Sequence, residues 1–419
     1  MYTEEAIAPE KGSPAAHVPV VRLDPFSDEF LSQPYAFHDD LRDAGPVVWL
    51  EKYGIHAMAR YAEVAATLKD WRTFCSGRGV GLADFSKEAP WRPPSLLLEV
   101  DPPLHDRTRL VVGRVLSAGS LQALRPLWQQ IADSVVEKLV ARGTFDAITE
   151  LAEVYLLKVF PDAVGLRPDG RENLLPYGSL AFNSFGPRNN RTEDAVAKSA
   201  PLVAWVAASC KRSALTKGGF GMGVFEAADR GEVSEDEAER LVRSFLTAGV
   251  DTIVNGLGNM IAAFAAHSGQ WQLLRENPEL ARKAFEEVLR WDSTVQTFFR
   301  TTTRDVEIGG INLPEGSKVL LFLAAANRDP RHWDDPEKFD VRRRTFGHVG
   351  FGAGVHACVG QAIARTEVES VLRALLKRVE RIEFAGEPQR RLNNTLRSWA
   401  SIPVRIHACG SNGFASTIQ

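Results

Sequence analysis

The segment Phe351-Gly-Ala-Gly-Val-His-Ala-Cys358-Val-Gly360 sets one cysteine among three closely spaced glycines. Metals bind the thiolate form of cysteine, not the thiol. A cysteine at the start of a helix is stabilised as an anion by free N–H groups and by the helix dipole. Glycines remove side chains where the backbone must approach a flat ligand closely. The segment is therefore compatible with Cys358 as a metal ligand, and its glycines would let the backbone lie close to a bound group.

Two other interpretations of this segment are weaker. A buried structural cysteine in a turn would not require so specific a pattern over ten residues. A dinucleotide-binding loop would use Gly352, Gly354 and Ala357, but no strand–helix–strand unit and no acidic residue at the right distance supports it. We therefore favour the metal-ligand interpretation.

Two further segments accompany the cysteine loop. Glu287 and Arg290 are three residues apart, so on a helix their side chains face one side and can pair. The segment 248–252, Ala-Gly-Val-Asp-Thr, places Asp251 in an apolar stretch. Charged residues are rarely buried, so a charged residue there indicates a functional role. These segments match the FxxGxxxCxG, ExxR and AGxDT patterns, and the chain resembles the cytochromes P450 from about Asp24 onward.

The resemblance implies a mainly α fold, a triangular helical prism enclosing haem b, with a smaller β-rich region. We expect a flexible N-terminus over residues 1–20 and one cytochrome P450 domain over residues 21–419. The residue pattern agrees with this organisation. It predicts a helical core over about 104–300 and 358–379, and it predicts β-rich parts near 47–60, 303–323 and 381–407. A capping box, Ser234 with Glu237, opens a long helix that runs through Ile253.

The resemblance also implies how the haem is held. Cys358 would be the axial iron ligand, with Phe351 beside the sulfur and Gly352 and Gly249 close to the haem. The propionates would be bound by His105, Arg109, Arg300 and His356. His105 and Arg109 lie at i and i+4 on one helix face, and two cationic donors suit two carboxylates. Glu287 and Arg290 would be structural and would anchor the meander before the cysteine loop, together with Arg342 or a neighbour.

The resemblance implies that the segment 248–252 takes part in the activation of dioxygen. Gly249 would leave room for dioxygen, Thr252 would hydrogen-bond its distal oxygen, and Asp251 would relay protons from solvent. Ser244, Ala248 and Thr252 are spaced by four, so they form one stripe that faces the haem if Thr252 does. Asp251 and Thr252 are the expected catalytic residues.

A closer resemblance concerns the substrate. The chain is similar to the bacterial cytochromes P450 that oxidise para-substituted benzoates, including 4-methoxybenzoate O-demethylases. The resemblance implies that Arg92 and Ser95, with Arg243 and Ser244, bind the carboxylate. The aromatic pocket would consist of Leu98, Phe182, Phe185, Ala248, Val295 and Phe298. Phenylalanines suit a flat ring through edge-to-face contacts. A P450 hydroxylase of another small hydrophobic substrate, such as a terpene or fatty acid, is the alternative.

The expected reaction hydroxylates the carbon bonded to the para oxygen, which releases formaldehyde and 4-hydroxybenzoate. The chain contains no flavin or iron–sulfur segment, and the resemblance implies that electrons from NAD(P)H arrive through a separate reductase and a [2Fe–2S] ferredoxin. We expect the ferredoxin to dock near Cys358, where His348 and residues 342–344 would supply positive charge. Two other classes are a peroxygenase and a non-catalytic haem sensor, and the presence of Asp251 and Thr252 argues against both.

Composition and charge bear on nucleic-acid binding, membrane insertion and the use of the other cysteines. The net charge of −3 gives no hint of nucleic-acid binding, and no run of about 18 apolar residues predicts a membrane span. The other cysteines form no CxxC pair, zinc pattern or covalent haem-attachment site; they are Cys75, Cys210 and Cys409. We therefore expect a cytoplasmic monomer that binds no membrane or nucleic acid.

Overall fold

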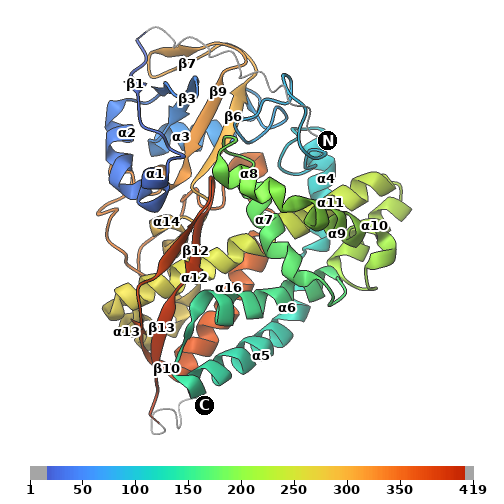
Figure 1. Cartoon of the computed structure of the whole chain (residues 1–419), viewed down its shortest axis with the longest axis vertical. Helices are drawn as coiled ribbons and strands as arrows, with labels where there is room; N and C mark the ends of the chain where they lie inside the picture. The colour runs from blue at the N-terminus through green and yellow to red at the C-terminus, as the bar shows by residue number, and fades with distance from the viewer. Residues whose placement is uncertain (1–16, 411–419) are drawn as a thin grey trace.

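The computed structural model describes residues 17–410. A large helical part lies below a smaller part built around a β-sheet (Figure 1). The expected flexible N-terminus lies mostly outside the described residues, although Val20–Val21 is described and forms strand β1. Within residues 17–410 no helix is both long and apolar enough to cross a membrane.

The helices of the larger part surround one extended apolar core. They are α4 (Leu104–Val115), α5 (Ala118–Arg142), α6 (Glu153–Val164), α7 (Leu174–Asn183), α8 (Asn190–Ala197), α9 (Ser199–Ser209), α10 (Phe220–Asp229), α11 (Glu235–Ala248), α12 (Asp251–Ala266), α13 (Ser268–Glu276), α14 (Ala281–Trp291) and α16 (Gln361–Arg378). The shorter helices near the sheet are α1 (Asp28–Ser32), α2 (His38–Ala44), α3 (Tyr61–Lys69) and α15 (Leu323–Ala326).

The largest sheet has six strands in the order β1-β2-β3-β9-β6-β4. After β1 its strands are β2 (Val48–Leu50), β3 (Ile55–Met58), β9 (Lys318–Phe322), β6 (Thr297–Thr302) and β4 (Phe74–Cys75). The smaller sheets contain β5 (Thr144–Asp146), β7 (Val306–Ile308), β8 (Ile311–Leu313), β10 (Val379–Phe384), β11 (Gln389–Leu392), β12 (Arg397–Ser401) and β13 (Pro403–Ala408). The three β-rich parts expected from the sequence all contain strands.

Three expected boundaries need correction. The helical core does not reach residue 300, because α14 ends at Trp291 and residues 297–302 form strand β6, which pairs with β9 over five positions. Strand β5 also interrupts the helical region and closes a three-stranded sheet with β13 and β10. Helix α16 begins at Gln361, three residues after Cys358, so the cysteine precedes the helix and does not belong to it.

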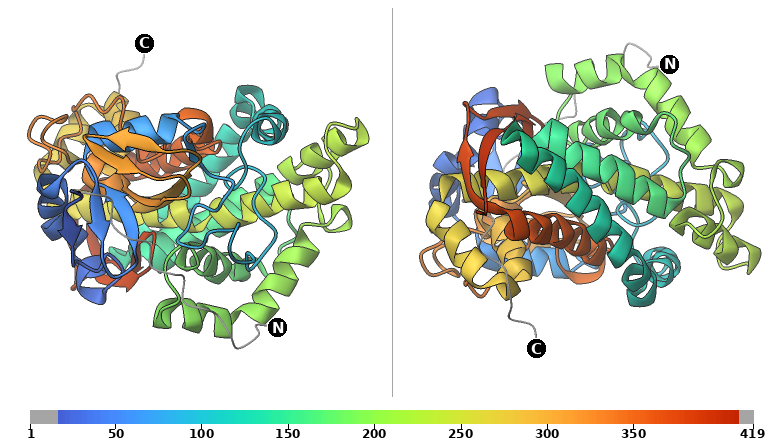
Figure 2. Two further views of the ribbon diagram at one scale, coloured as in Figure 1. Left: turned by 90° about the horizontal axis from the view of Figure 1, so that it is seen from above. Right: turned by 90° about the horizontal axis from the view of Figure 1, so that it is seen from below.

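The long helix expected to follow Ser234 is divided into α11 and α12. Its start is as predicted, because Ser234 and Glu237 form both hydrogen bonds of the capping box. The break falls at Gly249 and Val250, where the Thr252 hydroxyl donates to the Ala248 carbonyl oxygen over 2.7 Å. Both halves cross the middle of the molecule (Figure 2), and α16 packs against α5 beneath them. The break therefore lies deep inside the fold.

Candidate active site

The cysteine loop is closed by its own backbone. The N–H of Cys358 donates to the carbonyl oxygen of Phe351 over 2.8 Å. Burial raises the pKa of the Cys358 thiol, while the N–H groups of Gly360 and Gln361 act in the opposite direction. Cys358 is nevertheless exposed. A residue that is desolvated by surrounding protein and yet accessible faces a space inside the molecule, which suits a metal ligand.

Two glycines of this loop adopt backbone conformations that favour glycine over other residues. Gly352 and Gly354 both have φ of +69°, in the left-handed region that favours glycine. A side chain at Gly354 would lie 2.7 Å from the carbonyl oxygen of Leu68 in α3. Gly354 is therefore needed for packing against α3, and its expected closeness to a flat ligand stays a prediction.

A cluster of cations lies beside the loop. The rings of His105 and His356 are 4.5 Å apart between centroids. His356 is bonded to Asp101 over 3.2 Å, whereas Nε2 of His105 is buried without a hydrogen-bond partner in the described structure. Arg300 is 3% exposed, and burial lowers its pKa to about 10. The only hydrogen bond of its side chain within residues 17–410 goes to the carbonyl oxygen of Phe299.

Arg109 completes this cluster. Burial lowers the pKa of its guanidinium, and the nearby Cys358 acts in the opposite direction. Neither Arg109 nor Arg300 forms an ion pair with any described residue. A buried cation without a counter-ion is costly, so this arrangement calls for an anionic ligand. The thiol, the two unpaired arginines and the orphan His105 nitrogen together fit haem, which offers one iron and two propionates.

The expected helix stripe is present. Ala248 is exposed, and Ser244 and Thr252 are partly exposed, although they lie on helices whose other faces are buried. Asp251 and almost every residue from 253 to 264 are buried. The stripe is therefore the accessible side of these helices next to the break between α11 and α12.

Asp251 is held rigidly beside this break. Nδ2 of Asn255 donates to Oδ1 of Asp251 over 3.0 Å, and Oδ1 of Asn255 accepts from the N–H of Trp399 over 3.1 Å. Burial raises the pKa of the Asp251 carboxyl to about 6. The packing of α7 is close here, since a Cβ on Gly178 would lie 2.8 Å from the Asp251 Cβ. A carboxyl that titrates near neutral pH suits proton transfer.

At Gly249 the structure shows a packing reason for the absence of a side chain. A Cβ at this position would overlap the ring of Phe160 in α6. The missing side chain therefore allows α6 to pack against the break between α11 and α12. The structure thus gives Gly249 a packing role, and its expected role in leaving room for dioxygen stays a prediction.

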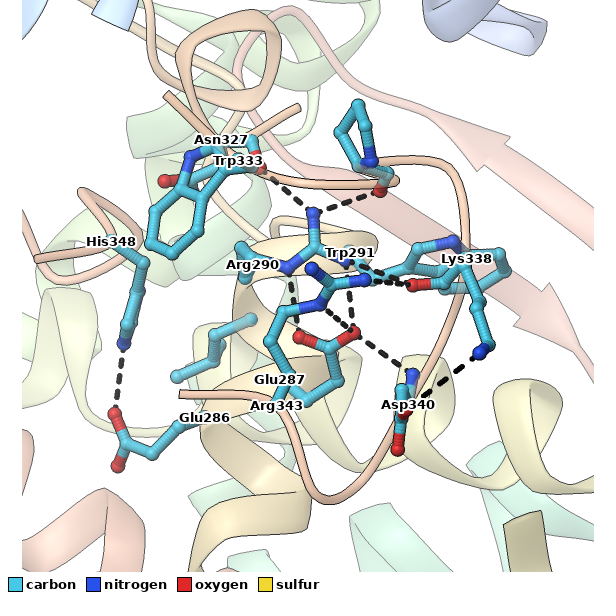
Figure 3. Close-up of polar contacts among 12 residues, drawn as sticks. Glu286, Glu287, Arg290, Trp291, Asn327, Trp333, Lys338, Asp340, Arg343 and His348 are labelled. Atoms are coloured by element: carbon cyan, nitrogen blue, oxygen red, sulfur yellow. Dashed lines mark hydrogen bonds and ion pairs between the residues drawn. The ribbon is translucent and has the colours of Figure 1, made fainter. Parts of the chain in front are cut away.

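The pair Glu287 and Arg290 organises the segment before the cysteine loop (Figure 3). Both side chains are fully buried and paired over 2.8 Å. Arg290 donates to the carbonyl oxygens of Asn327 and Pro336 over 3.0 and 2.9 Å. The third member of the network is Arg343, whose Nε lies 3.2 Å from Oε1 of Glu287. The sequence indicated Arg342 or a neighbour for this role, and the structure places the neighbour, Arg343, on Glu287.

Five of the six residues expected to line an aromatic pocket come together, while Ala248 lies on the helix stripe and is not part of their cluster. One apolar cluster contains Phe182, Phe185, Leu98, Val295 and Phe298. The ring of Phe185 lies 5.8 Å from those of Phe182 and Phe298, with interplanar angles of 84° and 62°. Val80 and Leu396 also belong to this cluster and were not predicted. No sequence signal singles them out, because each follows a turn in an irregular segment.

The four polar residues expected at the carboxylate end also meet. The hydroxyl oxygens of Ser95 and Ser244 are 3.2 Å apart. Arg243 donates to the carbonyl oxygen of Pro93 over 2.6 Å, and burial lowers its pKa. Arg92 is largely buried, and its Nε has no hydrogen-bond partner in the described structure. The segment before α4 and helix α11 thus form one polar site beside the stripe.

Two residues of this polar site were not predicted. Glu99 accepts from Arg92 over 2.8 Å and from the N–H of Ser95 over 2.6 Å. Arg240 donates to the carbonyl oxygen of Pro94 over 2.8 Å. A signal for Arg240 existed, since it lies one turn before Ser244 on the same helix face. The pairing of Glu99 depends on an irregular loop and left no such signal.

The positive surface expected near Cys358 is smaller than predicted. The side chain of His348 is 6% exposed and bonds to Glu286 over 2.8 Å, so it points inward. Arg343 is held by Glu287. Arg342 and Arg344 remain exposed, and the neighbouring Phe346 is 99% exposed.

Comparisons with known proteins agree with this geometry. The family model described as Cytochrome P450 matches residues 213–405. The chain is 52% identical to "Cytochrome p450 CYP199A2" of Rhodopseudomonas palustris over 97% of this chain and 99% of the relative. It is 29% identical to a beta-dihydromenaquinone-9 omega-hydroxylase of Mycobacterium tuberculosis, over 92% and 78% of the two chains. The structure of cytochrome P450 CYP109Q5 from Chondromyces apiculatus superposes with a TM-score of 0.78 at 29% identity, over 92% of this chain and 98% of that chain. The chain therefore belongs to the cytochrome P450 family and is a monooxygenase.

Proposed function

We propose that this monooxygenase oxidises the para substituent of small aromatic carboxylates, with oxidative O-demethylation of 4-methoxybenzoate as the representative reaction. One observation carries the proposal. Arg243 is partly buried, forms no ion pair with any described residue, and lies beside Ser95, Ser244 and Arg92. A partly desolvated guanidinium without a counter-ion next to two hydroxyl groups is a site for a carboxylate.

The residues that would hold haem are those of the cation cluster and the cysteine loop. Cys358 would bind the iron, and His105, Arg109, Arg300 and His356 would receive the propionates. When bound, haem with a thiolate ligand supplies the activation of dioxygen. Phe351 lies against Arg365, with the guanidinium 4.7 Å from the ring centroid, and would shield the sulfur from water.

The aromatic cluster supports a flat substrate. The rings of Phe182 and Phe298 make edge-type contacts with that of Phe185, and a benzene ring gains from edge-to-face contacts of this kind. With its carboxylate on Ser244, the substrate would extend along the helix stripe past Ala248 toward Thr252. The small side chain of Ala248 leaves room for a para substituent. Anchoring one end in this way orients the other end for reaction.

Protons would be delivered by residues at the helix break. Asp251 has a pKa of about 6, raised by burial, so it exchanges protons readily at neutral pH. Asn255 fixes Oδ1 of Asp251, which leaves the other carboxylate oxygen to take up and release the proton. The Thr252 hydroxyl donates to the Ala248 carbonyl oxygen, and its oxygen remains able to accept a hydrogen bond on the accessible side of the stripe.

The overall reaction balances as follows. The methoxy carbon gains a hydroxyl group from one atom of dioxygen, and two electrons with two protons reduce the other atom to water. The resulting hemiacetal then loses formaldehyde and leaves 4-hydroxybenzoate. NAD(P)H would supply the electrons through a reductase and a [2Fe–2S] ferredoxin, which would dock at the exposed residues Arg342, Arg344 and Phe346.

Turnover with matched substrates tests this proposal. The haem-loaded enzyme is supplied with NADH, a ferredoxin and its reductase, and 4-hydroxybenzoate and formaldehyde are quantified. Equal amounts of the two products from 4-methoxybenzoate, and far less product from 4-methoxytoluene, would support it. NADH-dependent oxidation of 4-methoxytoluene at the same rate would contradict the role of the carboxylate.

A further inference from the structure

Glu99 is a buried carboxylate inside the polar site, where an anionic substrate would have to bind. It is 4% exposed. Its Oε2 atom accepts two hydrogen bonds, one of 2.8 Å from Nη1 of Arg92 and one of 2.6 Å from the N–H of Ser95. A buried negative charge beside an anion site requires an explanation, because like charges repel strongly when they are desolvated.

The charges of the site can be counted from its ion pairs. Arg92 pairs with Glu99, and both side chains are nearly inaccessible. Arg240 lies 3.7 Å from the exposed Asp236. Arg243 forms no ion pair with any described residue. Three arginines and two carboxylates thus leave a single excess positive charge, located at Arg243.

The second effect of Glu99 is geometric. By accepting from the Ser95 N–H it fixes the backbone from which the Ser95 hydroxyl reaches Ser244. The Ser95 hydroxyl in turn accepts from the N–H of Leu98 over 3.2 Å, at the edge of the aromatic cluster. One carboxylate oxygen therefore positions a cation and a hydroxyl group for the same ligand.

We propose that Glu99 sets the charge selectivity of the substrate site, so that the site matches a head group with one negative charge. This inference rests on the proposed function, because it assumes that an anionic aromatic substrate binds at Arg243. A monoanion neutralises the excess charge. A dianion such as a phosphonate would leave uncompensated negative charge next to Glu99, and a neutral amide would leave Arg243 unpaired.

The substitution Glu99→Gln separates charge from shape. Because both hydrogen bonds end on Oε2, the single amide oxygen of glutamine can accept both, while the negative charge disappears. Glu88→Gln is the matched control, since Glu88 lies in the same segment, is exposed and pairs loosely with Arg188 at 3.7 Å. Both variants change the net charge of the protein equally.

The experiment measures dissociation constants by isothermal titration calorimetry on the haem-loaded enzyme. The probes are 4-methoxybenzoate, 4-methoxybenzamide and, in a mildly alkaline buffer, the dianion of 4-methoxyphenylphosphonic acid. In Glu99→Gln we expect Kd to fall about tenfold for the benzoate and about a hundredfold for the phosphonate, because the removed repulsion doubles with the ligand charge. The amide should change less than about threefold, and Glu88→Gln should match the wild type.

Several outcomes would overturn the inference. Equal changes for all three probes, or a weaker affinity for both anions, would show that Glu99 acts only through the shape of the loop. A matching effect of Glu88→Gln would assign the change to overall charge. If Glu99→Gln unfolds, Glu99→Asp keeps the charge, and a loss of selectivity there would contradict the proposal. Failure of the wild type to bind 4-methoxybenzoate would instead refute the proposed function.

Discussion

The hydroxyl oxygens of Ser95 and Ser244 lie 3.2 Å apart, although 149 positions separate the two residues in the chain. Ser95 belongs to the irregular segment before α4, and Ser244 lies on α11, one turn before Ala248. This contact joins the polar site to the helix stripe. A ligand held between the two serines is thereby placed at a fixed distance from Thr252.

The cation at Arg243 should dominate binding of the carboxylate. Arg243→Ala removes a partly buried charge-assisted donor, so Kd for 4-methoxybenzoate should rise about thirtyfold to a hundredfold or more. Arg243→Lys keeps the charge and should lose less. Binding of 4-methoxybenzamide, followed by calorimetry, serves as the neutral control. An Arg243→Ala variant that binds the benzoate as well as the wild type would place the carboxylate elsewhere.

Asp251 should make stability depend on pH. Its pKa of about 6, raised by burial above the ordinary value of 3.8, means that the folded protein binds more protons than the unfolded chain between these values. The free energy of unfolding should therefore fall as pH rises through this window, by about 3 kcal/mol in total. Urea unfolding of the wild type and of Asp251→Asn at several pH values measures the difference. Identical slopes for the two proteins would show that Asp251 does not titrate there.

The buried pair of Glu287 and Arg290 should be far more important for stability than a surface pair of the same type. Arg290→Ala removes the fully buried partner of Glu287, leaves Arg343 as its remaining cationic partner, and should lower the free energy of unfolding by about 3–5 kcal/mol. Arg373→Ala breaks another arginine–glutamate pair, in which Arg373 is exposed to solvent. This change should lower the free energy of unfolding by less than about 1 kcal/mol. Denaturant titrations compare the two, and similar losses would contradict the structural role.

The exposed side chains near the cysteine loop should govern electron delivery. Arg344→Glu reverses a charge on this surface, and Phe346→Ala removes a ring that is 99% exposed. Each should slow reduction by ferredoxin about tenfold at low salt, and added salt should diminish the Arg344 effect. Stopped-flow reduction is the measurement, and Arg167→Glu is the control for net charge. Unchanged reduction rates with both variants would move the docking surface elsewhere.

Sequence patterns predicted the parts of the site that depend on local spacing. The stripe of Ser244, Ala248 and Thr252 follows from the period of a helix, and the pairing of Glu287 with Arg290 follows from the same geometry. The cysteine loop was recognisable because its ten residues lie together in the chain. Each of these predictions needed only neighbours in sequence.

The remaining features depend on contacts between distant segments. The break after Ala248 follows from the packing of Phe160 against Gly249, which joins α6 to α11 and α12. Strand β6 was missed because its six residues carry no alternation of exposed and buried positions; most are buried in the sheet. Glu99 could not be predicted as part of the site, because its ion pair with Arg92 depends on how the irregular loop folds.

The most direct test of the account is an optical titration of the ferric haem-loaded protein with 4-methoxybenzoate, together with a carbon monoxide difference spectrum of the reduced protein. We predict a Soret band at the thiolate-ligated position with carbon monoxide and a low-to-high spin change on addition of the benzoate. A thiolate-type spectrum without any response to 4-methoxybenzoate would contradict the assigned substrate. A carbon monoxide spectrum without the thiolate band would contradict ligation by Cys358.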